Sequence, residues 1–345
     1  MDDKDLITGN PHCPLCKSIR SIFLLKNIDR QKIAVGGFSL FRCPQCHVAF
    51  IHPIPSPAEI SAFYPDNYYA YIEQSRTHSF FSRWIHHIRE LKKDEICHRR
   101  FGYPRRFPFN LIVYLLSYTK ARIDDLPRFV PDGKLLDVGC GKGDYLVEMK
   151  KMGWNVFGVE FAYAGVLTAQ KRGLEVFHGS IVDAPFSDNM FDFIRLEDVL
   201  EHLPNPLETM IILRNLLKDN GRVRITVPNL DAFTFKLFGT YWFPLETPRH
   251  LFMYSPSSIR NLAELAGFHV QNMTIRSHKE VDVIPSLLYW LEDKHKWAFD
   301  LATRRMGLLK VVRKLFFPVK WIATTLGYGS MITVILQQNK KVLHD

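Results

Sequence analysis

Four of the six cysteines stand in two C-x-x-C pairs, Cys13 with Cys16 and Cys43 with Cys46. Two such pairs separated by a strand-like interval bring four thiolates within tetrahedral reach of one ion, which suits Zn²⁺. Iron in a rubredoxin-like site is the alternative, whereas disulfides are disfavoured in a reducing compartment. We therefore predict a structural zinc site on these four cysteines. Because so small a module buries little core, the metal would supply its folding free energy.

The segment 135–144, LLDVGCGKGD, places an apolar strand directly before a glycine-rich turn and a helix pattern. Gly139, Gly141 and Gly143 allow a tight turn and a close approach of the backbone to a ligand, and Asp137 adds a carboxylate at the strand tip. The position three after Gly141 holds aspartate, so the third glycine of a dinucleotide fingerprint is missing. The turn thus predicts a nucleotide-type pocket and disfavours NAD.

A second predicted strand follows and ends in Glu160, whose carboxylate can accept hydrogen bonds from two vicinal ribose hydroxyls. The pattern Asp137-x-Gly139-x-Gly141-x-Gly143 followed by Glu160 resembles the cofactor-binding half of class I S-adenosylmethionine (SAM) methyltransferases. The resemblance implies that these five residues bind SAM. Another doubly wound fold with a glycine-rich loop, such as a dehydrogenase, is the alternative.

The same resemblance extends to the adenine end of the cofactor. Phe161 would pack on the adenine, although a surface or core role is the alternative. In the segment that contains Ser180 and Ile181, the family often presents an acid to the adenine amino group, and Ser180 stands in its place. Recognition of the base would therefore rely on backbone and apolar contacts.

After the fourth predicted strand, Glu201-His202 resembles the "EH" segment of class I small-molecule methyltransferases, including ubiquinone-pathway O-methyltransferases. The resemblance implies that His202 is a general base; the alternative is that it supports the following turn. Asp198-x-x-Glu201-His202 with the later His250 also resembles the divalent-metal site of small-RNA 2′-O-methyltransferases and some quinone O-methyltransferases. A second divalent metal there would acidify a hydroxyl acceptor, although Asp198 replaces the longer Glu of that pattern.

A regular alternation of strand and helix patterns from Leu126 onward predicts the α/β class. We expect a Rossmann-like, seven-stranded methyltransferase sheet with helices on both faces, a small N-terminal zinc ribbon and a helical insertion before the last strand. The seventh strand of this family is antiparallel. The predicted strands are Lys134–Val138, Asn155–Glu160, Glu175–His178, Phe191–Leu196, Gly221–Val227, Phe268–Ile275 and Met331–Leu336.

Five regions follow from this pattern. They are a zinc ribbon (1–53), an aromatic and basic helical connector (54–125), a SAM-binding core (126–276), a basic amphipathic helical insertion (277–330) and a final strand with a tail (331–345). The ribbon and the aromatic segment Tyr64–Tyr71 resemble the N-terminus of bacterial methyltransferases near glycan and cell-envelope pathways.

The chain has 345 residues and a formal net charge of +10, so a basic face could meet nucleic acid, anionic lipid or a phosphorylated substrate. In the insertion, lysines and arginines alternate with Leu, Phe and Trp, and Pro318 is expected to break or kink the helix. This segment could lie on a membrane surface, or pack on the core or on a second subunit. The acidic N-terminus and the absence of a long apolar run predict a cytoplasmic, non-spanning protein, with a peripheral place at the inner membrane surface as an option.

These features favour a SAM-dependent methyltransferase that O-methylates a sugar, glycan or lipid-linked acceptor. One alternative is a nucleotide-sugar C-methyltransferase. The other is an RNA-binding or RNA-modifying protein that uses the ribbon and the basic face. Nucleic acid is the less favoured partner because the basic residues are dispersed and form no arginine-rich tract.

Overall fold

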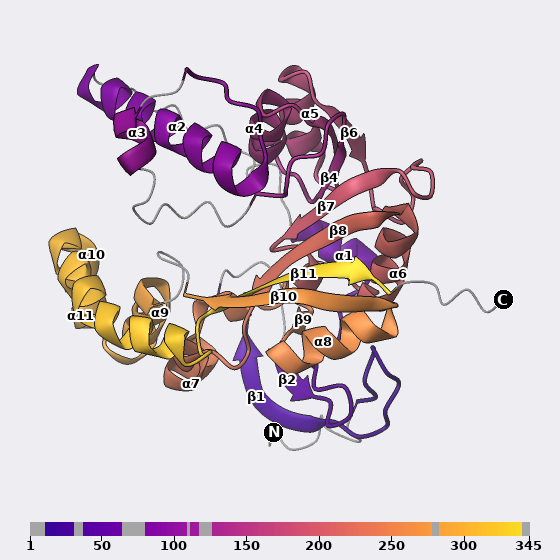
Figure 1. The fold of residues 1–345 in the computed structure, drawn as a ribbon. Coiled ribbons are helices and arrows are strands. Elements are labelled where there is room, and N and C mark those ends of the chain that lie inside the picture. The colour runs from indigo at the N-terminus through magenta and orange to yellow at the C-terminus, as the bar shows by residue number, and fades with distance from the viewer. Residues whose placement is uncertain are drawn as a thin grey trace, which may run out of the picture. The chain divides into compact units, whose positions relative to one another are not determined.

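A computed structural model describes residues 11–30, 37–63, 80–108, 111–116, 126–277 and 283–339. Two sheets organise these residues (Figure 1): a four-stranded sheet with the order β1-β2-β3-β9 and a seven-stranded sheet with the order β10-β11-β8-β7-β4-β5-β6. The chain divides into two compact units. One comprises residues 66–179 and 191–193, and the other comprises residues 1–65, 180–190 and 194–345.

The seven-stranded sheet confirms the predicted fold class. Parallel pairing joins β4 to β5 and β5 to β6, whereas β11 runs antiparallel to both β8 and β10, as expected of the last strand. The one large shift is that β8 begins at Leu217 rather than Gly221, directly after helix α6. The strands are β4 (Lys134–Val138), β5 (Asn155–Glu160), β6 (Glu175–His178), β7 (Phe191–Glu197), β8 (Leu217–Pro228), β10 (Phe268–Arg276) and β11 (Met331–Gln338).

The unit that holds the glycine turn is built on an apolar core of strand and helix residues. Trp154 is buried and donates its indole N–H to the hydroxyl of Tyr103 at 3.0 Å, and that hydroxyl donates to the carbonyl of Pro127 at 3.0 Å. Cys97, on α2, is buried in the same core. The predicted connector therefore contributes to this core. The helices are α2 (Phe80–Phe101), α3 (Leu111–Leu116), α4 (Asp144–Lys151) and α5 (Tyr163–Lys171).

In the other unit, the small antiparallel sheet begins with the ribbon strands β1 (Ile22–Ile28), β2 (Gly37–Arg42) and β3 (Ala49–His52). Its fourth strand is β9 (Phe252–Met253), which pairs with β3 so that Phe50 lies opposite Phe252. The sequence did not predict this pairing. It joins the ribbon to the segment that directly follows His250.

The remaining elements of this unit are mostly short. Helix α8 begins at a serine cap, where the side chain of Ser255 accepts a hydrogen bond from the backbone N–H of Ser258. The elements are α1 (Pro57–Ala62), α6 (Pro206–Leu216), α7 (Phe233–Phe238), α8 (Pro256–Leu265) and the 3₁₀ turns η2 (Leu200–His202), η3 (Gly239–Tyr241) and η4 (Phe243–Leu245).

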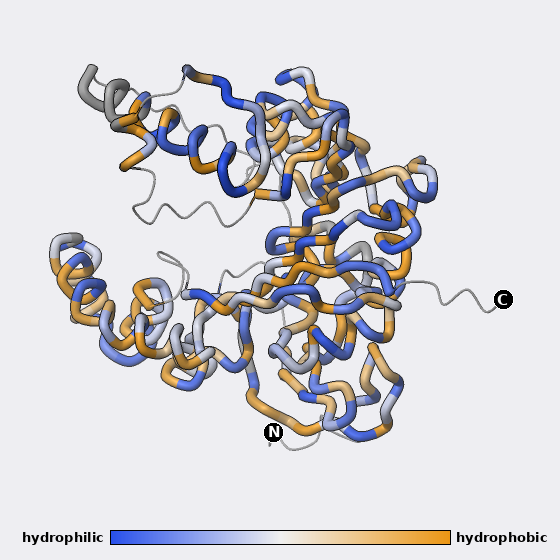
Figure 2. Tube along the Cα trace, viewed as in Figure 1, coloured by the Kyte–Doolittle hydropathy of each residue, from blue (hydrophilic) through white to orange (hydrophobic). Residues whose placement is uncertain are grey.

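Three helices precede the last strand: α9 (Val283–Lys294), α10 (Lys296–Arg304) and α11 (Met306–Thr325). Hydrophobic and hydrophilic residues alternate along them (Figure 2). Helix α11 continues through Pro318, so the expected break does not occur; proline removes only one backbone donor. Among the described residues, no helix is both long enough and apolar enough to cross a membrane. The aromatic segment Tyr64–Tyr71 lies outside the described residues.

Candidate functional site

The four cysteines of the two C-x-x-C pairs lie together. The Sγ atoms of Cys13 and Cys46 are 3.6 Å apart, and those of Cys16 and Cys43 are 3.5 Å apart. Four sulfurs bound tetrahedrally to Zn²⁺ at about 2.3 Å would be separated by about 3.8 Å. All six cysteines are free, so no disulfide competes for these thiols. The donor set and its spacing therefore fit a tetrahedral Zn²⁺.

Each cysteine pair lies on a tight turn whose backbone aims the sulfurs inward. Lys17 and His47, one residue after the second cysteine of each pair, have φ values of 60° and 63°, and each donates its N–H to the carbonyl of the first cysteine. The N–H of Cys46 also points to the sulfur of Cys43 at 3.5 Å. The hydrogen bond with Cys46 lowers the pKa of Cys13, which favours a thiolate in the cluster.

The glycine turn has the backbone that its sequence predicts. Gly139, Gly141 and Gly143 have φ values of 70°, 54° and 79°, a region that favours glycine. A Cβ at Gly143 would lie 2.3 Å from the Cδ1 atom of Leu174, whereas a Cβ at Gly141 would meet no atom within 4 Å. Gly143 is thus needed for packing, while Gly141 borders open space that a ligand could use.

Glu160 is buried beside this turn at the end of β5. One carboxylate oxygen accepts the N–H of Gly141 at 2.7 Å, and the other accepts the N–H of Ala162 at 2.8 Å. Burial raises the pKa of Glu160, and these backbone hydrogen bonds oppose the shift. Each oxygen keeps a second lone pair, so the carboxylate can hold the turn in place and still accept a hydroxyl donor.

The other residues predicted to bind SAM have different surroundings. Asp137 is buried at the end of β4, and the side chain of Phe161 is 53% exposed, which agrees equally with a binding role and with a surface role. Ser180 is partly buried and accepts the N–H of Val182 at 3.3 Å, while Ile181 is buried. The SAM-binding roles of these residues stay predictions.

Glu201, His202 and His250 form a second cluster of potential metal ligands, with one donor atom from each within 4.8 Å of the others. The Nδ1 atoms of His202 and His250 lie 3.0 Å and 2.7 Å from the carbonyls of Arg249 and Pro244. Since a carbonyl oxygen only accepts, each Nδ1 carries the proton, and each neutral ring has a lone pair on Nε2. Backbone carbonyls orient metal-binding histidines in this way.

Burial fixes the charges in this cluster. It lowers the pKa of His202 to about 3 and the pKa of His250 to about 4, so both rings are neutral at neutral pH. Burial and the nearby Asp198 raise the pKa of Glu201 well above its usual value. Glu201 is fully buried, and neither of its carboxylate oxygens has a hydrogen-bond partner among the described residues. Such a group is costly unless something binds it, and a cation fits this gap.

Two further acids flank the cluster. Asp198, a predicted ligand, is exposed and lies outside the group of three donors. Glu246, which the sequence did not single out, has a carboxylate oxygen 3.5 Å from Nε2 of His250 and binds Arg249 at 2.9 Å. Both acids have positive φ, 53° and 34°, a strain that collects at functional sites. The spacing of Glu246 and His250, four residues apart, is the signal that could have identified Glu246.

The ribbon positions this cluster through the backbone of Leu251. The N–H of Leu251 donates to the carbonyl of Glu201 at 2.8 Å, and its carbonyl accepts the N–H of Ile51, on β3, at 3.0 Å. Nearby, Arg249 donates to the carbonyl of Phe63 at 3.5 Å. His250 thus lies in a segment held on one side by the ribbon and on the other by η2.

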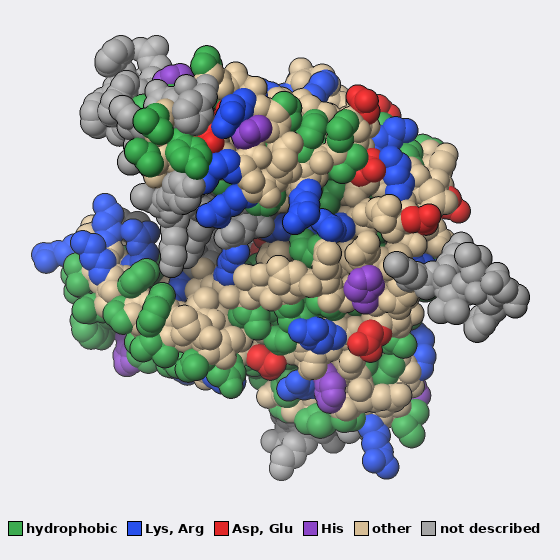
Figure 3. Space-filling model, viewed as in Figure 1, with side chains coloured by type: hydrophobic (Ala, Val, Ile, Leu, Met, Phe, Trp, Pro, Cys, Tyr) green, Lys and Arg blue, Asp and Glu red, His purple; other side chains and the backbone are tan. Residues whose placement is uncertain are grey.

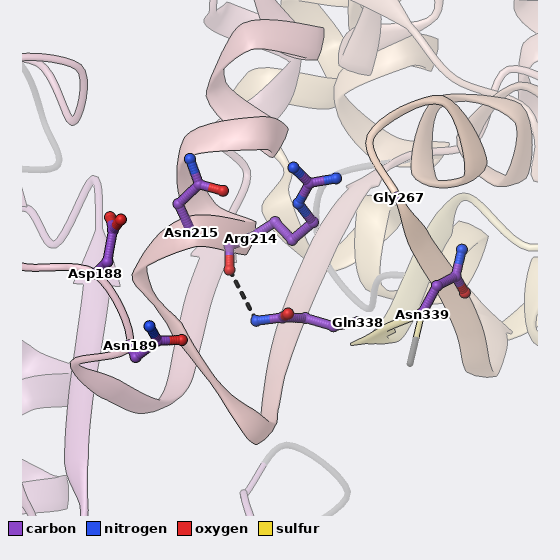
Figure 4. Close-up of a pocket in the computed structure, with 7 residues that line it drawn as sticks. All are labelled: Asp188, Asn189, Arg214, Asn215, Gly267, Gln338 and Asn339. Atoms are coloured by element: carbon purple, nitrogen blue, oxygen red, sulfur yellow. Dashed lines mark hydrogen bonds between the residues drawn. The ribbon is translucent and has the colours of Figure 1, made fainter. Parts of the chain in front are cut away.

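A polar pocket of about 430 Å³ occurs elsewhere in the unit that contains the histidine cluster (Figure 4). It lies where α6 and β11 end, near the amino ends of β7 and β8, whereas ligands of open α/β sheets bind at the carboxyl ends. Gln338 crosses it to donate to the carbonyl of Arg214 at 2.8 Å. We assign it no role. Its lining residues are Asp188, Asn189, Arg214, Asn215, Gly267, Gln338 and Asn339.

The family described as "Methyltransferase domain" matches residues 110–272, which include the glycine turn and the Glu201–His202 segment. An uncharacterized protein of Methanocaldococcus jannaschii is 31% identical over 137 residues, which are 39% of this chain and 62% of that protein. The chain thus spans less than two thirds of that relative. The ubiquinone biosynthesis O-methyltransferase of Rickettsia prowazekii is 26% identical over 204 residues, 54% of this chain and 79% of that enzyme.

Among solved structures, a SAM-dependent methyltransferase of Archaeoglobus fulgidus aligns with a TM-score of 0.41 at 15% identity, covering 75% of this chain and 100% of that one. The family match indicates a methyltransferase domain in residues 110–272, and the strand order of the seven-stranded sheet agrees with the fold predicted for it.

Proposed function

We propose that the protein transfers the methyl group of SAM to a hydroxyl of a small sugar, glycan or lipid-linked acceptor. The observation that carries the choice of a hydroxyl is the buried carboxylate of Glu201, which has no hydrogen-bond partner among the described residues and lies beside two neutral imidazoles. Methyl transfer breaks the sulfur–carbon bond and forms an oxygen–carbon bond, and the acceptor must lose its proton. The cluster supplies groups for that deprotonation.

Glu201, His202 and His250 would hold a divalent cation, with Glu246 close to His250. A bound cation would lower the pKa of the acceptor hydroxyl. The prediction that His202 acts alone as a general base has less support, because a ring with a pKa of about 3 binds protons weakly. Burial instead keeps the ring neutral.

Two further observations support the acceptor class. The Rickettsia relative is named a ubiquinone biosynthesis O-methyltransferase, which places O-methylation among the chain's similar proteins. The ribbon also resembles the N-terminus of bacterial methyltransferases near glycan and envelope pathways. We further propose that the protein works at the inner membrane surface, where lipid-linked acceptors lie.

A cation titration tests the role of Glu201. Zinc-loaded protein should bind one additional Mn²⁺ or Co²⁺, detected by calorimetry, and Glu201→Gln should weaken this binding by more than about a hundredfold, since even outer-shell changes cost 10- to 100-fold. Glu208→Gln, an exposed acid on α6, is the matched control and should leave the affinity unchanged. A second cation that binds Glu201→Gln as tightly as wild type would refute the assignment.

Calorimetry with SAM tests the cofactor site independently. Glu160→Ala removes a carboxylate that can accept two charge-assisted hydrogen bonds, each contributing roughly 1.5–3 kcal/mol, so SAM should bind at least about a hundredfold more weakly. Glu175→Ala, an exposed acid at the start of β6, should bind SAM like wild type. Equal affinities for wild type and Glu160→Ala would exclude Glu160 from the cofactor site.

A further inference from the structure

Helix α11 exposes a continuous apolar stripe. Its six side chains recur every three or four residues and therefore share one face of the helix. They remain between 42% exposed, at Val319, and 71% exposed, at Leu315. Another face of the helix carries Leu309 and Ala323, both buried, so the helix already packs on the protein through other residues. The stripe consists of Leu308, Val311, Leu315, Val319, Ile322 and, directly after the helix, Leu326.

The charges along α11 have one sign. Between residues 301 and 339 the chain has six lysines and arginines and no aspartate or glutamate. Large aromatic side chains stand among them, with Trp297, Phe317 and Trp321 at 73%, 67% and 62% exposure. Figure 3 shows hydrophobic side chains gathered over α11, with Lys and Arg side chains beside them at the α10 end. The six cations are Arg304, Arg305, Lys310, Arg313, Lys314 and Lys320.

We infer that this face of α10 and α11 binds an anionic lipid surface, with α11 lying in the plane of the interface. At 1.5 Å per residue the stripe is about 27 Å long. Its apolar side chains would enter the acyl boundary while the cations on the remaining surface of the helix meet lipid phosphates. A second copy is the poorer partner, because a two-fold contact would bring two cationic faces together.

This inference rests on the proposed membrane location and specifies the face and the lipid charge, but it does not depend on methyl transfer. It also gives the unusual composition of the insertion a physical reason. A lipid-linked acceptor would then reach the enzyme by diffusion within the membrane plane.

Flotation of the full-length protein with vesicles tests the inference. Wild type should float with phosphatidylcholine–phosphatidylglycerol vesicles and stay unbound with pure phosphatidylcholine. The double variant Leu315→Glu/Ile322→Glu should lose at least about tenfold in bound fraction. Lys310→Gln/Arg313→Gln/Lys314→Gln should lose about fivefold in affinity for each charge, at about 1 kcal/mol per cation near the surface. Leu265→Glu, at an α8 leucine that is 55% exposed, is the matched control and should float like wild type.

The affinity for SAM is also measured on each variant. A folded variant should keep the wild-type SAM affinity whatever happens to flotation, so this measurement distinguishes a failure of the inference from a failure of the proposed function. Wild type that stays unbound with anionic vesicles would overturn the inference. So would a concentration-dependent dimer in light scattering that Leu315→Glu/Ile322→Glu dissolves, since the face would then belong to a second copy.

Discussion

The cysteine cluster and the histidine cluster both gather potential metal ligands in the same unit, but only one of them is complete. Four sulfurs already have the number and spacing of a tetrahedral zinc site. Glu201, His202 and His250 supply three donors, and the carboxylate of Glu201 has no partner among the described residues. A filled set of four ligands suits a structural metal, whereas three ligands leave a position for substrate.

We therefore expect the cysteine cluster to stabilise the fold and the histidine cluster to take part in the chemistry, although both lie in the same unit. The ribbon has little core of its own and should depend on zinc for its folding. Its strand β3 then supports the histidine cluster through the backbone of Leu251. The histidine cluster instead holds a buried acid that has no hydrogen-bond partner among the described residues, and burying such a group costs free energy. Mutation of the cysteine cluster should therefore lower the stability of the protein, whereas replacement of the buried acid in the histidine cluster should raise it.

The largest effect is expected at the cysteine cluster. Cys43→Ser should lose the zinc and unfold the ribbon, because metal binding provides its folding free energy, on the order of 10 kcal/mol in zinc-finger peptides. Elemental analysis should fall from one zinc per chain to none, and amide exchange should accelerate at Leu251 and Phe252. Cys97→Ser changes another buried cysteine and should keep its zinc. Full zinc retention in Cys43→Ser would remove the distinction between the clusters.

At the histidine cluster, mutation should change the free energy of unfolding in the opposite direction. Glu201→Met replaces the buried carboxylate by an apolar side chain of similar length. It should raise the free energy of unfolding of zinc-loaded protein, measured without added cation, by about 1–3 kcal/mol, since a buried unpaired polar group costs that much. Denaturant unfolding measures the change. A destabilised Glu201→Met protein would show that Glu201 supports the fold, as the cysteines do.

A smaller effect concerns pH. The pKa of His250 is lowered to about 4 in the folded protein, so between about pH 6.5 and 4 the unfolded chain binds a proton there that the folded chain does not. The contribution of His250 to stability is thus intact above about pH 6.5 and declines as the pH falls through this window, at about 1.4 kcal/mol per pH unit.

His250→Asn removes this linkage. Between pH 6.5 and 5, the unfolding free energy of wild type minus that of the variant should fall by about 1.4 kcal/mol per pH unit. Denaturant titrations at several pH values measure this change. Zinc release from the ribbon affects both proteins alike and cancels. A difference that does not vary with pH would mean that His250 is protonated when folded.

The features of the molecule that its sequence predicts are local. The glycine turn and the C-x-x-C pairs are short motifs whose backbone is set by neighbouring residues, and the seven strands follow from hydrophobic patterns. The pairing of β3 with β9 escaped prediction because β9 has only two residues and its partner lies about two hundred residues earlier. Glu246 was missed for a different reason: it lies only four residues before His250, but the turn with positive φ that places it there has no recognisable motif.

Methyl transfer itself is the most direct test. Wild type and Glu201→Gln would be incubated with labelled SAM and an extract of envelope lipids and glycans, and the label in acceptor products would be counted by mass spectrometry. We expect methyl ethers on a hydroxyl acceptor with wild type, and at least about a hundredfold fewer with Glu201→Gln although SAM binds both proteins equally. Equal labelling by the two proteins, or label found only on carbon, would contradict this expectation.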